Sequence, residues 1–340
     1  MAYQGLHFMQ MLSFLYGVML MVFAWASWQA WYSASLTETT QPLKAFILLS
    51  LYYWSYLLFP WLFLTVWQWY DAKINTIQAI SMLFIAGILI YARFIEPYSI
   101  VVQHTELKLD EQKALTKSLK IALIADLHIG LYSGREKQLK LIVEKINQQQ
   151  PDFVVVSGDW TYEPEQSLVQ ELAVLRQLQA PVYSVNGNHD EQYPGPPIQK
   201  LLADALKNNG VIDIENQVIE FEEVRLLGVG DLWAGKANLN HLPNYPQDKL
   251  WLLLSHNPDT VEMVPQLATK PLMLSGHTHG GQIELPWLTD YVLKKVSILG
   301  HKRGYYRHEN ANVFVTVGTG MVGAPFRFRV PPTIDILHLK

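Results

Sequence analysis

Residues 120–128 read KIALIADLH, a short apolar run followed at once by Asp126 and His128. Four later stretches also join an apolar run to a polar end: FVVVSGD at 153–159, VYSVNGNHD at 182–190, LWLLLSHN at 250–257 and LMLSGHTHGGQ at 272–282. Apolar runs of this length, bounded by glycine and polar residues, are typical of buried β-strands. Because ligands of open α/β sheets bind beyond the carboxyl ends of strands, we expect these polar residues to converge.

The chain between the early runs predicts helices. Within residues 138–148 the apolar side chains recur at helical spacing, and residues 166–178 and 198–206 are expected to be helical too. Further strands are expected at 224–229 and around 99–103. The alternation of strands and helices predicts an α/β domain with buried strands.

The polar residues after the strands suit metal ligation. In an extended chain a spacing of two points both side chains to one side, as expected for Asp126 with His128 and for His277 with His279. Imidazole with carboxylate suits Zn, Fe or Mn, and amide oxygen favours harder ions. Eight candidate ligands are available at these strand ends, which is enough for two ions that share one carboxylate. Glycines beside them would permit tight turns and close approach of the backbone to an anion.

Each motif is weak by itself, but the ordered set resembles the calcineurin-like metallophosphoesterase superfamily, over roughly residues 120–340. The resemblance implies a four-layer α/β/β/α sandwich built on two sheets. It implies that Asp126, His128 and His279 bind one divalent ion, that Asn188, His256 and His277 bind the other, and that Asp159 bridges them. Manganese is the first expectation, and zinc, iron or magnesium are the alternatives. The resemblance also implies that His189 lies next to the substrate without binding metal, and that Asp190 orients His189.

A narrower resemblance concerns the membrane-anchored bacterial branch, which includes UDP-2,3-diacylglucosamine pyrophosphatases. It rests on Glu96-Pro97-Tyr98, on GVGDL at 228–232 and on the stretch from Gly318 to Arg327. This resemblance singles out Arg327 as a substrate-binding residue. One departure is that Trp160-Thr161-Tyr162 follows Asp159, where members of the family often have a further acidic residue, so the substrate contacts expected there are in question.

The first 96 residues predict a membrane anchor. Their charged residues are few and sum to zero: Glu38, Lys44, Asp71, Lys73, Arg93 and Glu96. Three uncharged runs, 1–37, 45–70 and 74–92, are each long enough to cross ~30 Å of hydrocarbon at ~1.5 Å per residue. Pro60 is expected to kink the second of these transmembrane helices. We therefore expect an anchor of three transmembrane helices at 1–96, a connector at 97–119 and the catalytic domain at 120–340.

Composition and charge exclude other classes of protein. The chain has no cysteine, which excludes a disulfide-stapled secreted scaffold, and its net charge of −4 disfavours a nucleic-acid binder. The N-terminus lacks the basic flank and cleavage site of a signal peptide. Lys44 and Arg93 on one side of the membrane outnumber Lys73 on the other, which favours a cytoplasmic catalytic domain. The resemblance to the bacterial branch implies a location in the bacterial inner membrane.

The expected function is that of a membrane-anchored two-metal phosphohydrolase. Its substrate would be a phosphodiester or pyrophosphate, lipid-linked like UDP-2,3-diacylglucosamine. One alternative is a general phosphodiesterase or phosphatase that is merely tethered to the membrane, and another is a metal-binding sensor or scaffold without turnover. The expected partners are the phosphoester or pyrophosphate substrate and the bilayer, with no nucleic acid and no obligate protein partner inferred. The basic residues of one tract either contact the phosphate of the substrate or only form a solvated surface: Lys294, Lys295, Lys302, Arg303 and Arg307.

Overall fold

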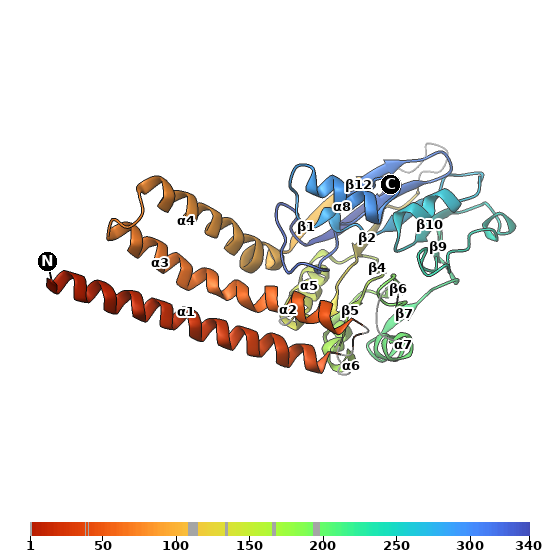
Figure 1. The fold of residues 1–340 in the computed structure, drawn as a ribbon. Helices are drawn as coiled ribbons and strands as arrows, with labels where there is room; N and C mark the ends of the chain where they lie inside the picture. Colours follow the sequence, from red (N-terminus) through yellow and green to blue (C-terminus); the bar gives the residue numbers. More distant parts are fainter. Residues whose placement is uncertain are drawn as a thin grey trace.

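A computed structural model describes residues 2–37, 39, 41–107, 115–132, 135–164, 168–192 and 198–340 (Figure 1). Three parts of the sequence predictions lie outside these ranges, namely Glu38, residues 108–114 of the expected connector and residues 166–167 of the second expected helix.

The N-terminal third consists of long apolar helices that extend away from the remaining domain (Figure 1). They are α1 (Ala2–Leu36), α2 (Pro42–Trp54) with α3 (Leu58–Tyr70), and α4 (Thr76–Ile90), which continues to Tyr98 through a π-helical and a 3-10 turn. Three spans are long and apolar enough to cross a membrane: Met9–Leu36, Pro42–Tyr70 and Thr76–Tyr98.

The second span changes its helical geometry just before Pro60. A 3-10 turn at Ser55–Leu57 separates α2 from α3. Proline has no N–H to donate to the carbonyl four residues earlier, so the regular hydrogen-bond ladder is interrupted at this point. The interruption agrees with the prediction that Pro60 perturbs this span without ending it.

The domain contains two six-stranded sheets. In spatial order, the first sheet is β1 (Val101–Leu107), β14 (Thr333–Leu339), β2 (Leu119–Ile124), β4 (Phe153–Ser157), β6 (Val182–Val185) and β7 (Val211–Asp213). The second is β12 (Gly304–Arg307), β13 (Asn312–Val315), β11 (Leu272–Ser275), β10 (Leu250–Leu254), β9 (Val224–Gly228) and β8 (Val218–Glu220). A two-stranded ribbon joins β3 (Ile129–Gly130) to β5 (Thr161–Tyr162).

The sheets face each other and bury a continuous apolar core. Side chains such as Leu123 of the first sheet and Leu252 of the second meet in this core. The outer face of the first sheet is covered by α5 (Arg135–Gln149), α6 (Leu168–Glu171) with a 3-10 segment at Ala173–Gln177, and α7 (Gln199–Asn208). On the outer face of the second sheet, apolar residues of the 3-10 segments Leu242–Asn244 and Pro258–Met263 pack against the strands. The mixed α/β sandwich expected from the sequence is confirmed.

The segment expected to be a connector contributes a strand to the first sheet. β1 pairs in parallel with β14 along its whole length, from Val101 opposite Thr333 to Leu107 opposite Leu339. β14 in turn pairs antiparallel with β2. Residues 101–107 of the expected connector therefore pair with the first sheet, close to where a strand was expected around residues 99–103.

The N-terminal helices pack against the domain. Apolar side chains of both are buried in one cluster: Ala30, Ala45, Leu49 and Tyr52 from the helices with Leu131, Tyr132, Tyr162 and Met321 from domain loops. The Tyr52 ring stacks on the Tyr132 ring with centroids 5.2 Å apart. The Arg327 N–H donates to the Ala92 carbonyl at 2.9 Å, and the Val330 N–H donates to the Glu96 carboxylate at 2.6 Å. These contacts fix the ends of the helices against loops of the sandwich.

Candidate metal centre

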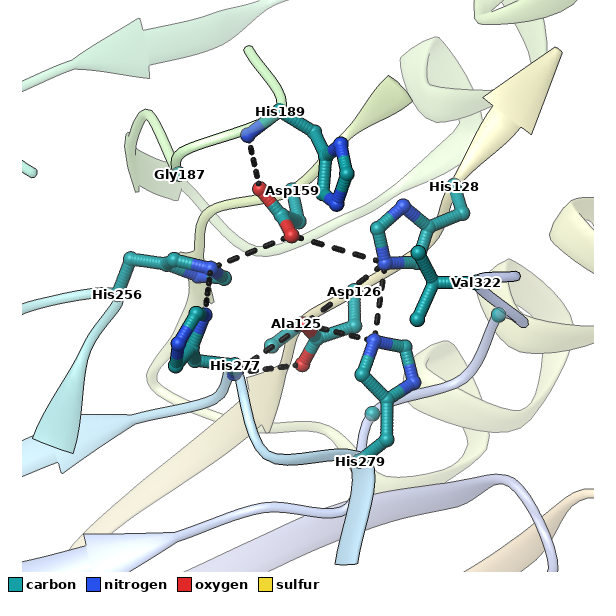
Figure 2. Close-up of polar contacts among 12 residues, drawn as sticks. Ala125, Asp126, His128, Asp159, Gly187, His189, His256, His277, His279 and Val322 are labelled. Atoms are coloured by element: carbon teal, nitrogen blue, oxygen red, sulfur yellow. Dashed lines mark hydrogen bonds and ion pairs between the residues drawn. The ribbon is translucent and has the colours of Figure 1, made fainter. Parts of the chain in front are cut away.

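Five strands direct their carboxyl ends to one place between the sheets (Figure 2). Asp126 and His128 follow β2, Asp159 follows β4, and Asn188 follows β6. From the second sheet, His256 follows β10, and His277 and His279 follow β11. The structure therefore brings together all seven residues that the sequence proposes as ligands, all of them buried.

The first cluster contains Asp126, His128 and His279. The Nε2 atoms of His128 and His279 lie 3.0 Å apart. The Asp126 Oδ1 atom is 3.3 Å from the His279 Nε2 atom and 4.0 Å from the His128 Nε2 atom. One carboxylate oxygen and two ring nitrogens thus face a common point.

The second cluster contains Asp159, His256 and His277, with Asn188 beside them. The His256 Nε2 atom lies 3.3 Å from the Asp159 Oδ2 atom, 3.1 Å from the His277 Nδ1 atom and 3.1 Å from the Asn188 Oδ1 atom. The same Asp159 Oδ2 atom is 3.6 Å from His128 Nε2 of the first cluster. Asp159 therefore lies between the two clusters.

Carbonyl groups fix which nitrogen of three histidines carries the hydrogen. The pairs are His128 Nδ1 with the Thr161 carbonyl at 3.3 Å, His256 Nδ1 with the Ser157 carbonyl at 2.7 Å, and His277 Nε2 with the Val296 carbonyl at 3.0 Å. A carbonyl only accepts, so in the neutral form of each ring the other nitrogen presents its lone pair to the clusters. Ring nitrogens that face one another at 3.0–3.1 Å fit a cation placed between them. The donor set therefore fits two metal ions.

The electrostatics of the centre agree with this fit. Burial lowers the pKa of His128 and of His277 to about 3, and the pKa of His279 lies well below its usual value for the same reason. These imidazoles are neutral at pH 7, which is the form that binds metal. Burial alone would lower the pKa of His256, but the neighbouring Asp159 carboxylate outweighs it and raises the pKa to about 10. The Asp159 carboxylate thus stabilises the protonated, positively charged form of His256.

The backbone at the ligands departs from the expected extended geometry. Five ligand residues have a positive φ: Asp126 (53°), His128 (50°), Asp159 (54°), His277 (70°) and His279 (51°). This conformation is costly for residues other than glycine and persists only where the surroundings enforce it. This conformation directs the side chains of His277 and His279 into different clusters. The expectation that both face one side of an extended chain is therefore wrong for this pair.

The glycines beside the ligands make room for a ligand side chain. A Cβ atom on Gly276 would lie 2.6 Å from the Asp126 Oδ2 atom and 2.5 Å from the Ala125 Cβ atom. A Cβ atom on Gly318 would lie 2.6 Å from the Asp126 Cβ atom. The close approach expected of such glycines is therefore made to Asp126 itself.

His189 and Asp190 lie beside the clusters. The half-buried His189 ring lies edge-on to the rings of His128 and Tyr162, with centroids 5.3 and 5.0 Å away. The backbone N–H of His189 donates to the Asp159 Oδ1 atom at 3.0 Å (Figure 2). The buried Asp190 carboxylate accepts from the N–H groups of Trp160, Thr161 and Gly187 and from the Thr161 hydroxyl, at 3.0–3.1 Å. Asp190 therefore ties together the loops that present Asp159 and Asn188. Its orientation of His189 stays a prediction.

Arg327 does not have the position expected of a substrate ligand. Its side chain has no exposed surface, and its guanidinium donates to the carbonyls of Gly320, Val330, Val317 and Gly318 at 2.8–3.3 Å. Arg327 lies near the site, as the resemblance implied, but its buried side chain supports the loop that packs on Asp126. Direct substrate contact by Arg327 does not fit this geometry.

Some features of the site had no signal in the sequence motifs. Tyr162, which contacts His189 and His128, follows the second motif by three residues and was noticed only as a departure from the family pattern. Val296, whose carbonyl orients His277, lies far along the chain from every motif. A carbonyl partner carries no side-chain chemistry, so sequence reasoning could not find it.

Comparison with known proteins places the chain in a family. Residues 119–302 match the calcineurin-like phosphoesterases. The chain is 29% identical over 262 residues to the metallophosphoesterase YkuE of Bacillus subtilis (strain 168), covering 74% of this chain and 89% of YkuE. It is 31% identical over 237 residues to the phosphodiesterase YaeI of Escherichia coli (strain K12), covering 65% and 82%. It is 26% identical over 309 residues to the UDP-2,3-diacylglucosamine pyrophosphatase LpxG of Chlamydia muridarum (strain MoPn / Nigg), covering 73% and 92%. The chain therefore belongs to the calcineurin-like phosphoesterases, a family of metal-dependent hydrolases.

Proposed function

We propose that this protein is a membrane-anchored phosphohydrolase that uses two divalent metal ions to cleave a phosphodiester or pyrophosphate bond of a lipid-linked substrate. The observation that carries the proposal is the pair of donor clusters with Asp159 between them, 3.3 Å from His256 and 3.6 Å from His128. The names of two relatives, a phosphodiesterase and a UDP-2,3-diacylglucosamine pyrophosphatase, support the reaction class and the substrate class.

The geometry supports the proposed roles. Asp126, His128 and His279 would hold one ion, Asn188, His256 and His277 would hold the other, and Asp159 would be shared between them. Two such ions supply a water of lowered pKa and neutralise the charge of the phosphoryl oxygens. His189 lies at the edge of the centre, where a half-buried imidazole is placed to give a proton to the leaving oxygen. The bond from the His189 N–H to Asp159 positions it for this task.

Manganese is the proposed metal, and zinc, iron or magnesium are the alternatives. The clusters combine imidazole nitrogens with carboxylate and amide oxygens, a mixture that intermediate transition ions accept well. Measuring hydrolysis of a soluble phosphodiester after adding each ion to metal-free protein would rank them.

We propose an inner-membrane location with a cytoplasmic catalytic domain. The three apolar spans support the membrane anchor. Lys44 and Arg93 lie at the domain end of the helices and Lys73 at the opposite end, which supports this orientation by the positive-inside rule. Because the chain has no cysteine, Lys73→Cys provides a single labelling site. We expect an impermeant maleimide to reach it from the periplasmic side, and labelling only from the cytoplasmic side would reverse the topology.

Asp159→Asn tests the two-metal proposal. The amide keeps the size of the side chain but removes a unit charge about 3.5 Å from groups of both clusters, a Coulomb energy of about 5 kcal/mol at an effective dielectric constant of ~20. We expect kcat to fall by about a thousandfold and bound metal to fall below two ions per chain, as measured by elemental analysis. Asp204→Asn on the exposed face of α7 is the matched control. Near-normal hydrolysis by Asp159→Asn would reject the proposal.

A substrate comparison separates the alternatives. We expect hydrolysis of detergent-solubilised UDP-2,3-diacylglucosamine and little hydrolysis of its deacylated analogue. Equal rates on both would identify a general phosphodiesterase or phosphatase that is only tethered to the membrane. Binding of two metal ions without turnover of any phosphoester would identify a sensor or scaffold.

A further inference from the structure

The segment around α8 (Leu288–Val296) exposes an unusual set of large apolar side chains. Trp287 is 85% exposed, Tyr291 60% and Ile298 94%. Four further apolar residues of the segment are exposed: Leu285, Leu288, Val292 and Leu299. A contiguous exposed apolar surface of this kind marks a contact with another molecule or with a membrane. We call residues 285–299 the α8 surface.

Helical spacing makes this surface continuous. Tyr291 and Val292 lie three and four residues after Leu288, and Lys295 lies four and three residues after them, so the four side chains form one stripe along α8. The Lys295 ammonium lies 4.3 Å from the centroid of the Tyr291 ring, at the end of the stripe. The opposite side of the helix is buried through Thr289 and Leu293. α8 is therefore apolar on the side that faces outward as well as at its buried contacts.

The charge around the α8 surface is opposite to that of the whole chain. Residues 285–307 contain five basic residues and one acidic residue, whereas the chain has a net charge of −4. Lys302 and Arg303 bond to Glu284 at 2.7 and 3.0 Å, while Lys294 and Lys295 are exposed at the end of α8. An exposed stripe of Trp, Tyr, Leu and Ile flanked by lysine is the pattern of helices that lie in the interface of an anionic bilayer.

The position of α8 fits the edge of the membrane. About 20 helical residues cross the hydrocarbon, so the third span, starting at Thr76, leaves it near Ile95. Phe326 lines a cavity of about 340 Å³ together with Leu58 and Leu89. These two leucines belong to the parts of the second and third spans that cross the hydrocarbon. The loop that ends at Phe326 is therefore at the membrane boundary.

Hydrogen bonds connect this loop to the start of the α8 surface. The Gln282 side-chain amide donates to the carbonyls of Val322 and Ala324 at 3.1 and 2.9 Å. At the other end, Arg303 lines a cavity with Val101 of β1, the strand that directly follows the third span. The segments that precede and follow the α8 surface thus lie next to the junction between the N-terminal helices and the domain.

The α8 surface also adjoins the metal centre. A cavity of about 240 Å³ is lined by α8 residues on one side and by the loop on the other: Leu288, Val292 and Val296 with Val322 and Ala324. His277 and His279 also line it. The Val296 carbonyl at the end of α8 accepts from the His277 ring. A hydrocarbon chain that entered from the α8 surface would reach the ligands through this apolar cavity.

We propose that the α8 surface lies in the headgroup region of the bilayer that holds the N-terminal helices, and that it admits the hydrocarbon part of a lipid to the cavity beneath α8. The proposal rests on the membrane location proposed above. It assigns to the domain a membrane contact of its own, separate from the anchor, and it gives the lysines at the end of α8 an anionic lipid surface as their partner.

A fluorescent label tests the contact without reference to activity. The full chain carrying Ile298→Cys, labelled with a polarity-sensitive fluorophore, is placed in nanodiscs that contain phosphatidylglycerol. Lys207→Cys, exposed at the end of α7, is the matched control. We expect a blue-shifted emission at position 298 that brominated lipids quench, and neither effect at position 207. Equal behaviour at the two positions would overturn the proposal, as would protection of position 298 that depends on protein concentration, which would indicate a second copy of the chain.

Activity measurements test the consequence. Trp287→Ser and Ile298→Ser alter exposed side chains, so the fold is expected to persist. Loss of one buried apolar side chain from the interface is expected to lower hydrolysis of a bilayer-embedded lipid substrate by about tenfold. Hydrolysis of the water-soluble bis(p-nitrophenyl) phosphate should not change. Equal loss on both substrates would contradict the proposal. If the unaltered protein hydrolyses neither substrate, the proposed function fails, and the label at position 298 still decides on the membrane contact.

Discussion

Replacing Arg327 should lower the stability of the protein before it affects substrate binding. The guanidinium is fully buried and donates to four backbone carbonyls, those of Val317, Gly318, Gly320 and Val330. Arg327→Met leaves the carbonyls of Val317, Gly320 and Val330 without this donor, whereas the Gly318 carbonyl still accepts from the Thr333 N–H. A buried acceptor without a partner costs about 1–3 kcal/mol, so even the lowest value gives about 3 kcal/mol for three carbonyls, a large part of the ~5–15 kcal/mol that stabilises a typical domain. For a domain of this size we expect the melting temperature to fall by roughly 10 °C.

The loop held by Arg327 also packs on a metal ligand, so metal affinity should fall together with stability. Gly318 lies so close to Asp126 that a Cβ atom there would be 2.6 Å from the Asp126 Cβ atom. The assay is thermal unfolding in detergent, with KM and kcat for a soluble phosphodiester measured on the same samples. Arg329→Met, two residues along the chain and exposed, is the control and should leave all three quantities close to their original values.

Arg327→Lys distinguishes support from substrate contact. Lysine keeps the charge but has no planar fork with which to reach four carbonyls, so we expect an intermediate loss of stability. If this variant kept its melting temperature and raised KM about tenfold, which is ~1.4 kcal/mol of lost binding, Arg327 would contact substrate and the reasoning from burial would be refuted.

Three further perturbations test the centre and the sheet. In Gly276→Ala the new methyl group would lie 2.6 Å from the Asp126 Oδ2 atom, so we expect loss of metal binding, and an unchanged metal content would contradict the packing argument. Burial raises the pKa of Asp335 from its usual 3.8 to about 7, so the folded state holds a proton there that the unfolded state releases. The free energy of unfolding should therefore fall as the pH rises from about 4 to 7, by up to about 4 kcal/mol. Asp335→Asn should remove this pH dependence, as judged from melting curves at pH 5 and pH 8. An identical pH dependence in the variant would disprove the role of Asp335. Removal of metal with a chelator should abolish hydrolysis and lower the melting temperature, since a ligand at a hundred times its Kd stabilises by about 2.7 kcal/mol, and calorimetry that detects no difference would show that the clusters hold no ion.

The strands of the two sheets were largely predictable because their sequence signal is local. β10 at Leu250–Leu254 coincides residue for residue with an apolar run. A strand that is buried on both faces needs an apolar residue at every position, so its bounds are visible as the ends of the run. The ligands were predictable for a related reason, since each follows such a run directly.

Other features depend on contacts that a local pattern does not contain. A strand around residues 99–103 was expected, but its place in the sheet was not, because the partner of the edge strand β1, β14, lies more than 200 residues away. The separation of His277 from His279 depends on positive φ values at both residues, which only the packed loops enforce. The burial of Arg327 depends on four carbonyls of a loop that has no regular structure. In each case the decisive information is tertiary.

Packing also changes the meaning of the boundary near residue 96. The amino-acid composition changes sharply at this boundary because the surroundings of the side chains change. Contacts between the N-terminal helices and the domain nevertheless continue across the boundary. Leu131 lies three residues after His128, and Tyr162 lies three residues after Asp159; both are buried against the N-terminal helices. The loops that present two of the ligands are therefore held from one side by these helices. Since the positions of metal ligands depend on the contacts that orient them, the helices form part of the wall of the centre, in addition to the anchoring role proposed for them.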